Sequence, residues 1–147
     1  MDIDIVNPTS KEEVNDLYLF AKNILNIKQD HPRDLHFYQN IFEQNPEYLL
    51  MAKNEDQVIG VLLASEDPDD GDTILVGELA VDRSVRGKGV GTLLLKRIEE
   101  EARKHNKKSI LLGARGTAER FYLRNGYTPR LFVQIKGDNR LDTLKNI

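Results

Sequence analysis

Residues 78–92 read ELAVDRSVRGKGVGT and join an apolar run to a run with helical periodicity. The preceding residues, 74–81, have the composition of a buried strand, and three glycines alternate with other residues from Gly87 to Gly91. A turn of this kind exposes the amide groups of the first helical turn, where the helix dipole is positive. The stretch therefore predicts a strand, an anion-binding turn and a helix in succession.

Two common phosphate-binding loops differ from this turn. A P-loop requires GxxxxGK[ST], and the residues that follow Gly89 and Gly91 are Val90 and Thr92. The dinucleotide fingerprint requires GxGxxG directly after its strand, whereas here GxGxG follows the loop 82–86. Another kind of nucleotide-phosphate binder stays open as an alternative, although no acidic metal-binding motif accompanies the loop.

The rest of the sequence alternates strand-like and helical segments around this turn. Period-2 patterns and apolar runs predict strands over residues 2–6, 48–52, 58–64, 74–81, 109–114 and 127–136. Helical periodicity predicts helices over 10–25, 32–45, 90–104 and 117–125. The order βααβββαβαβ indicates an α/β fold in one domain, 1–147, with a mixed, mostly antiparallel sheet and helices on both faces.

Local signals place the ends and faces of these helices. Ser10 to Glu13 has the form of a capping box, which starts the first helix. In the helix after the glycines, five apolar residues form the stripe that should face the core: Val90, Leu93, Leu94, Ile98 and Ala102. Glu99 with Arg103, and Glu100 with Lys104, are expected as i, i+4 pairs on the solvent side.

Composition excludes several classes of function. The chain has 147 residues and no cysteine, which excludes disulfides, thiolate zinc sites and a cysteine nucleophile. A metal site is not expected from its three scattered histidines. A formal net charge of −3 and the lack of a basic stripe argue against nucleic-acid binding. No apolar run is long enough for a membrane span, so we expect a cytoplasmic protein without membrane association. We expect it to be a monomer or a homodimer.

A second motif lies downstream, where residues 118–127 read AERFYLRNGY. Together with the R-G-x-G-x-G turn behind ELAVD, it makes the chain resemble the GNAT superfamily of acyl-CoA-dependent N-acyltransferases. The order of helices and strands over residues 1–136 agrees with that family. The resemblance implies acetyl-CoA as cofactor and a parallel strand pair that splays between residues 74–81 and 109–114.

The resemblance also implies which residues bind the cofactor. Main-chain groups of the strand that ends in Leu79, Ala80 and Val81 would bind the thioester and pantetheine. The pyrophosphate would be bound by the turn of Arg86, Gly87, Lys88, Gly89, Val90, Gly91 and Thr92. Ala118 and Tyr122 of the second motif would also contact the cofactor. Arg115 stands where the family often has an Asn that contacts pantetheine, and the alternatives for the arginine are the cofactor phosphate and an anionic substrate group.

Tyr122 matches the usual general acid of the family. A phenol has an ordinary pKa near 10 and a thiol near 8.5, so a site that lowered the phenol pKa would ease proton transfer to the departing thiolate. Glu78 is the candidate general base, with its side chain on the face opposite to Leu79 and Val81; a carboxylate on a solvated face is the alternative. His31 and His36 are weaker candidates for the base or for the lining of the amine pocket.

We therefore expect an N-acetyltransferase acting on a primary amine in a ternary complex, with a non-catalytic acyl-CoA-binding sensor as the alternative. The acceptor is not identified by any motif. The acidic loop 67–72 could attract a polyamine or a basic peptide, but a solvated turn explains it better. Residues 137–147 should supply the closing strand of the fold, either as a hairpin from Gly137 or as a strand exchanged with a dimer partner.

Overall fold

The computed structural model describes residues 1–147 except 27–30, 115–117 and 136–137. The helices are α1 (Lys11–Leu25), α2 (Leu35–Gln44), α3 (Val90–Lys104) and α4 (Ala118–Arg124), with short 3-10 helices η1 (Pro46–Tyr48) and η2 (Arg83–Val85). The strands are β1 (Ile3–Val6), β2 (Leu49–Asn54), β3 (Gln57–Glu66), β4 (Thr73–Val81), β5 (Ser109–Ala114), β6 (Thr128–Ile135) and β7 (Asp138–Asn146). The α/β class and the predicted order are confirmed, with one strand added at the end.

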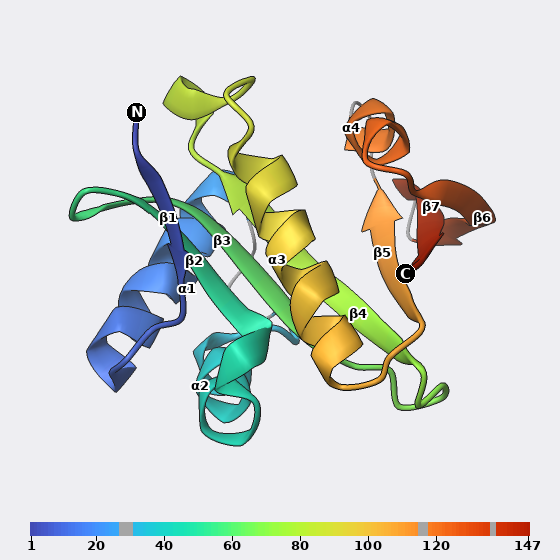
Figure 1. Ribbon diagram of the computed structural model, residues 1–147, viewed down its shortest axis with the longest axis horizontal. Helices are drawn as coiled ribbons and strands as arrows, with labels where there is room; N and C mark the ends of the chain where they lie inside the picture. The colour runs from blue at the N-terminus through green and yellow to red at the C-terminus, as the bar shows by residue number, and fades with distance from the viewer. Residues whose placement is uncertain (27–30, 115–117, 136–137) are drawn as a thin grey trace.

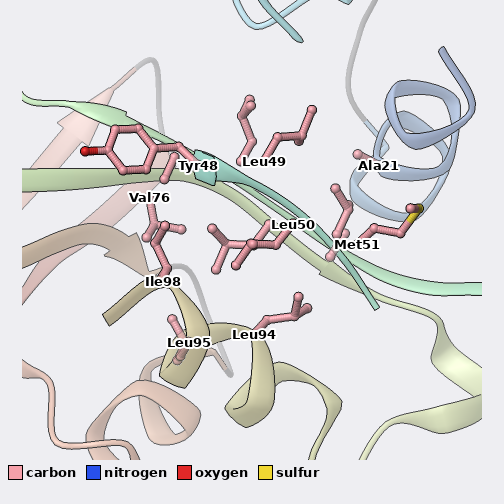
Figure 2. Close-up of a cluster of buried hydrophobic side chains, with 14 of the residues drawn as sticks. Ala21, Tyr48, Leu49, Leu50, Met51, Val76, Leu94, Leu95 and Ile98 are labelled. Carbon is pink, nitrogen blue, oxygen red and sulfur yellow. The ribbon is translucent and has the colours of Figure 1, made fainter. Parts of the chain in front are cut away.

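One seven-stranded sheet organises the molecule, in the order β1-β2-β3-β4-β5-β7-β6. All neighbouring strands are antiparallel except β4 and β5, which are parallel. Helix α3 covers one face and α1 with α2 the other (Figure 1). Figure 2 shows the two halves of the core: Leu50 and Val76 lie toward Ile98 of α3, whereas Leu49 lies on the side of Ala21 of α1.

The two helices on the α1 side both begin at a side-chain cap. The hydroxyl of Ser10 accepts a hydrogen bond from the amide of Glu13 at 3.2 Å, which confirms the predicted start of α1. A carboxylate oxygen of Asp34 accepts one from the amide of Phe37 at 3.0 Å. Caps of this kind satisfy amides that a helix cannot bond itself. The Asp34 cap fixes the residue at which α2 begins, and therefore the position of Arg33, which directly precedes the cap.

Helix α3 differs from its predicted amphipathic pattern at two positions. Leu93 was expected in the core stripe, but its side chain is 39% exposed. Glu99 was expected on the solvent side, but it is buried and accepts hydrogen bonds from Tyr127 at 2.9 Å and from Lys145 at 3.0 Å. Periodicity could not reveal this, because Tyr127 and Lys145 come from segments 28 and 46 residues further along the chain.

The strand added to the predicted order is β7, the last in the sequence. Strand β7 pairs with β5 on one side, from Ser109 with Asn146 to Ala114 with Leu141, and with β6 on the other. The closing strand therefore comes from the same chain as a hairpin after β6. Residues 136–137, which include the predicted hairpin position Gly137, lie outside the described residues.

None of the helices in the described ranges combines the length and the apolar composition that crossing a bilayer demands.

Candidate active site

Strand β4 carries a bulge in its middle. Leu63 of β3 pairs with Glu78, and Ala64 pairs with Val76. Gly77 is therefore an extra residue on β4. Directly paired residues share a face of the sheet and successive residues alternate, so the bulge places Val76 and Glu78 on opposite faces although they are two residues apart. Val76 faces α3 (Figure 2), and the carboxylate of Glu78 points to α2 on the other face.

Strands β4 and β5 separate at the same point. Their parallel pairing runs from Thr73 with Ser109 to Val76 with Leu112. Beyond Val76 the structure, in the part of the chain that it describes, gives residues 77–81 of β4 no partner on β5, and Figure 1 shows the two strands diverging. The predicted splay of the parallel pair is confirmed.

Glu78 is buried, with an exposed fraction of 4%, so the alternative of a carboxylate on a solvated face is wrong. The hydroxyl of Tyr38 donates a hydrogen bond to its Oε1. Nε of Arg33 donates one to Oε2 at 3.3 Å. Burial raises the pKa of Glu78, while the hydrogen bond from Tyr38 and the charge of Arg33 act in the opposite direction. The carboxylate is thus held at both oxygens in a partly desolvated place.

Tyr38 and Arg33 approach that carboxylate from different sides. Burial and the nearby Glu78 charge raise the pKa of Tyr38, so its phenol remains a donor at every ordinary pH. The ring of Tyr38 also packs edge-on against Tyr18 of α1, with centroids 5.6 Å apart. Arg33 lies in the segment before α2, and 30% of its side chain is exposed. Glu78 is therefore anchored from the core by Tyr38 and covered toward solvent by Arg33.

Only one of the two predicted histidines lies beside these residues. Nδ1 of His31 accepts a hydrogen bond from the backbone amide of Arg33 at 3.1 Å. His36 is exposed on α2. The group formed by Glu78, Tyr38, Arg33 and His31 is called the Glu78 cluster below.

The glycine turn forms the start of α3, as predicted. Asp82 begins it by accepting hydrogen bonds from the amide and the hydroxyl of Ser84, both at 2.9 Å. Gly87 and Gly89 have φ values of 81° and 86°, the left-handed region that a side chain makes costly. A Cβ atom at either would meet nothing within 4 Å. These two glycines are therefore required by the backbone, and the space beside them is open.

The third glycine, Gly91, is required by side-chain packing and not by its backbone conformation. A Cβ atom at Gly91 would come 2.8 Å from Cζ of Phe121, so Gly91 allows α4 to pack closely against the start of α3. Tyr122 is the next residue on α4, and only 7% of its surface is exposed. Its ring contacts those of Phe121 and Tyr127, with centroids 5.3 Å and 6.0 Å away. The fold thus brings the two sequence motifs together.

Burial raises the pKa of Tyr122 to about 12. This is opposite to the lowered value that would ease full proton transfer to a thiolate. A phenol with such a pKa stays neutral, so Tyr122 can donate a hydrogen bond but gives up its proton reluctantly.

The other predicted cofactor residues lie along the same edge. Leu79 and Val81 are partly buried, and Ala80 is buried. Arg86 and Lys88 are exposed beside the two open glycines, Val90 packs in the core, and Thr92 is partly buried in the first turn of α3. Ala118 begins α4, whereas Arg115 lies outside the described residues. Their roles in binding stay predictions.

Arg33 and Tyr38 were not predicted as site residues. Tyr38 falls on an apolar stripe of α2 with Leu35, Ile41 and Phe42, and no motif surrounds Arg33. They lie 45 and 40 residues before Glu78 in the sequence. The one available signal was Gly77 next to a strand carboxylate, because a glycine inside a strand often marks a bulge or a close approach.

The sequence matches the family model described as the acetyltransferase (GNAT) family over residues 12–127. No curated protein compared with the chain matches it.

Several solved structures share the fold over nearly the full length of both chains. Ard1 from Thermoplasma volcanium is 18% identical, with a TM-score of 0.81 and 99% of this chain and 97% of that chain covered. A NatC complex bound to Gag peptide and CoA is 17% identical, with a TM-score of 0.82 and coverages of 100% and 99%. An aminoglycoside 6'-N-acetyltransferase complexed with coenzyme A is 17% identical, with a TM-score of 0.80 and coverages of 99% and 97%.

Proposed function

Because the chain belongs to the acetyltransferase (GNAT) family, we propose that it transfers an acetyl group from acetyl-CoA to a primary amine by direct attack in a ternary complex. The observation that carries the proposal is the coincidence, at Gly77, of the splay between β4 and β5 with a buried carboxylate on the next residue. One fold relative is a NatC complex bound to Gag peptide and CoA, and another is an aminoglycoside 6'-N-acetyltransferase, which supports a peptide or a small molecule as the acceptor.

The residues of the glycine turn fit a CoA pyrophosphate. Gly87 and Gly89 are exposed, and open space surrounds the position of a Cβ atom at each. Gly89 caps α3 without a side-chain hydrogen bond, so the first amides of the helix are left for a ligand. Arg86 and Lys88 would add positive charge. The free edge of β4, residues 77–81, would hold the pantetheine arm.

The chemistry that acetyl-CoA supplies when bound is an electrophilic thioester carbonyl with a thiol as leaving group. Glu78 takes the proton that the attacking amine loses. A carboxylate with a raised pKa is a better base near neutral pH than an ordinary one, and the hydrogen bond from Tyr38 keeps it in one orientation. No covalent link to a side chain is required, in agreement with the lack of cysteine.

Tyr122 acts as a hydrogen-bond donor to the leaving sulfur. Its pKa of about 12 stands roughly 3.5 units above that of a thiol, so complete transfer of its proton would be uphill by about 5 kcal/mol. A hydrogen bond to a charged acceptor contributes about 1.5–3 kcal/mol without complete transfer. The phenol therefore stabilises the developing thiolate mainly by donating to it.

Tyr122→Phe is expected to lower kcat by about 10–100-fold, the effect of losing one hydrogen bond to a charged group. Its affinity for CoA should stay close to that of the wild type, because the glycine turn is unchanged. Thiol release with a panel of amines measures turnover, and thermal stabilisation by acetyl-CoA, CoA and ATP measures binding. Tyr48→Phe is the matched control, since Tyr48 is also buried but lies near His105 at the far end of α3.

The outcomes separate the alternatives. Stabilisation by CoA without thiol release from any amine would favour a non-catalytic sensor. Stabilisation by ATP and not by CoA would favour a nucleotide-phosphate binder. Equal kcat for Tyr122→Phe and the wild type would remove Tyr122 from its role.

Gly89→Ala is expected to weaken CoA binding about tenfold. A left-handed φ costs an alanine about 1–2 kcal/mol, and the turn relieves this strain by leaving the conformation that presents its amides. Calorimetric titration with CoA measures the change. Gly71→Ala is the control, because its Cβ atom would also meet nothing within 4 Å but its φ lies outside the left-handed region. Unchanged CoA affinity in Gly89→Ala would contradict this role of the turn.

A further inference from the structure

We propose that Arg33 selects the acceptor. The acceptor is an amine whose α-carbon also bears a carboxylate or a carbonyl group, as in an α-amino acid or a peptide N-terminus. Polyamines and other amines with a second nearby ammonium are excluded by the same residue. The inference rests on the proposed function, with Glu78 as the group that receives the amine.

The Glu78 cluster leaves one side of the carboxylate toward solvent, and that side is the one that Arg33 covers. Tyr38 reaches Oε1 from the core and is fully buried. Arg33 reaches Oε2, and its side chain is 30% exposed while that of Glu78 is 2% exposed. An amine that comes to Glu78 from solvent therefore has the guanidinium beside it.

The protein provides a specific place for this arginine. A Cβ atom at Gly77 would lie 3.0 Å from Cδ of Arg33 and 3.4 Å from its Nε. Gly77 has no left-handed φ that would by itself require glycine. The missing side chain at the bulge is thus explained by the passage of Arg33 across it. On the other side, the hydrogen bond to His31 holds the backbone of Arg33.

The guanidinium retains donors for a ligand. Its contact with Glu78 uses Nε. Within the described residues, Glu78 is the one acidic group paired with Arg33, which leaves both terminal nitrogens available. Terminal guanidinium nitrogens match the geometry of a carboxylate and also donate to a carbonyl oxygen. The carboxylate or carbonyl oxygen of such an acceptor belongs to a group on the carbon that bears the reacting amine, and this group would lie beside the guanidinium when the amine is beside Glu78.

A second ammonium in that position would instead meet a permanent positive charge. Like charges a few ångströms apart near a protein surface disfavour binding by at least about tenfold. The acidic loop 67–72 does not offset this repulsion. It precedes the first residue of β4, about five residues or roughly 17 Å from Glu78 along the strand. Its carboxylates are also used locally: Asp67 and Asp70 accept hydrogen bonds from backbone amides two residues on.

The test is a series of amines that differ in one substituent: alanine, alaninamide, isopropylamine and 1,2-diaminopropane, with alanyl-alanine as the peptide probe. Thiol release with acetyl-CoA gives kcat/KM, calculated on the concentration of unprotonated amine. We expect the carboxylate and carbonyl compounds to exceed isopropylamine, and isopropylamine to exceed the diamine by at least about tenfold. The preference between alanine and alanyl-alanine identifies the source of the acceptor.

Three variants connect this order to Arg33. Arg33→Gln should reduce the ratio of alanine to diamine by at least about tenfold, mainly through KM. Arg33→Lys should keep the exclusion of the diamine because the charge remains, but lose part of the preference for the carboxylate. Gly77→Ala should resemble Arg33→Gln, because the added methyl group displaces an intact arginine. Arg103→Gln, an exposed arginine on α3, is the control and should leave the order unchanged.

Calorimetric titration of the CoA-saturated protein with the same amines measures its affinity for each amine, independently of turnover. A diamine that is used or bound as well as alanine would overturn the proposal, as would an unchanged ratio in Arg33→Gln. Thiol release from none of the amines would contradict the proposed function instead, while the binding data would still decide the role of Arg33.

Discussion

Glu78→Gln is expected to lower kcat by about 10²–10⁴-fold, the usual contribution of a positioned general base. Glutamine keeps the size of the side chain and can still accept from Tyr38, but it cannot take a proton from the amine. Affinity for CoA should change little, because the carboxylate lies on the α2 face and the glycine turn at the start of α3. Thiol release under saturating acetyl-CoA measures the effect.

Glu66→Gln is the control, at a carboxylate with similar partners whose side chain is 50% exposed. Glu66 also accepts a hydrogen bond from a buried tyrosine, Tyr48, and also pairs with a basic residue, Lys107. It lies on the face of Ala64 and Val76, opposite to that of Leu63 and Glu78, so its loss should leave turnover unaffected. Similar losses in both variants would indicate a structural effect and argue against Glu78 as the base.

The pH dependence of the wild type provides a second readout of Glu78. A base works when ionised, so kcat/KM, calculated on the concentration of unprotonated amine, is constant above the pKa of the base and falls as the pH drops below it. Burial raises the pKa of Glu78, so this fall should occur at a higher pH than for an ordinary glutamate, near 4.3. Tyr38→Phe removes a hydrogen bond that lowers the pKa, and should move the fall to still higher pH. A fall that stays in place would contradict the role of Tyr38.

Lys145→Met is expected to lower the free energy of unfolding by about 3 kcal/mol. The change leaves the buried carboxylate of Glu99 without its cationic partner, and removing one member of a buried ion pair costs about 3–5 kcal/mol. The lower end applies because the Lys145 side chain is 27% exposed. It also removes the hydrogen bond from Lys145 to the carbonyl of Asn125, at 2.9 Å, which joins β7 to the end of α4. Urea unfolding measures the loss.

Lys104→Met is the control for this prediction. Lys104 pairs with Glu101 on the same helix, but its side chain is 68% exposed, so its loss should cost less than about 1 kcal/mol. Adding Glu99→Gln to Lys145→Met should recover part of the stability, since no unpaired charge then stays buried. If Lys145→Met costs no more than Lys104→Met, the pair holds β7 less firmly than its geometry indicates.

The sequence was sufficient for the parts of the site that depend on short segments. The turn from β4 through Gly87 and Gly89 into α3 follows from local composition, and so does the motif around Tyr122. The surroundings of Glu78 were not accessible in this way. They depend on a bulge that reverses the alternation of β4, and on Arg33, whose position is set by the start of α2.

The two errors on α3 have a related cause. Leu93 fits a helical stripe but is 39% exposed. Glu99 fits the opposite face but is covered by Tyr127 and Lys145 from the C-terminal segments. A helical period gives the direction of a side chain and not what other segments place over it.

The place of β7 in the sheet has a consequence for how the protein is made. Because β7 lies between β5 and β6, β6 has no strand to pair with until residues 138–146 have left the ribosome. Until then β5 also exposes an open edge, to which strands of other chains could add. The half of the sheet from β1 to β4 can form earlier, whereas the β5-β7-β6 half can be completed only after β7 has been synthesised.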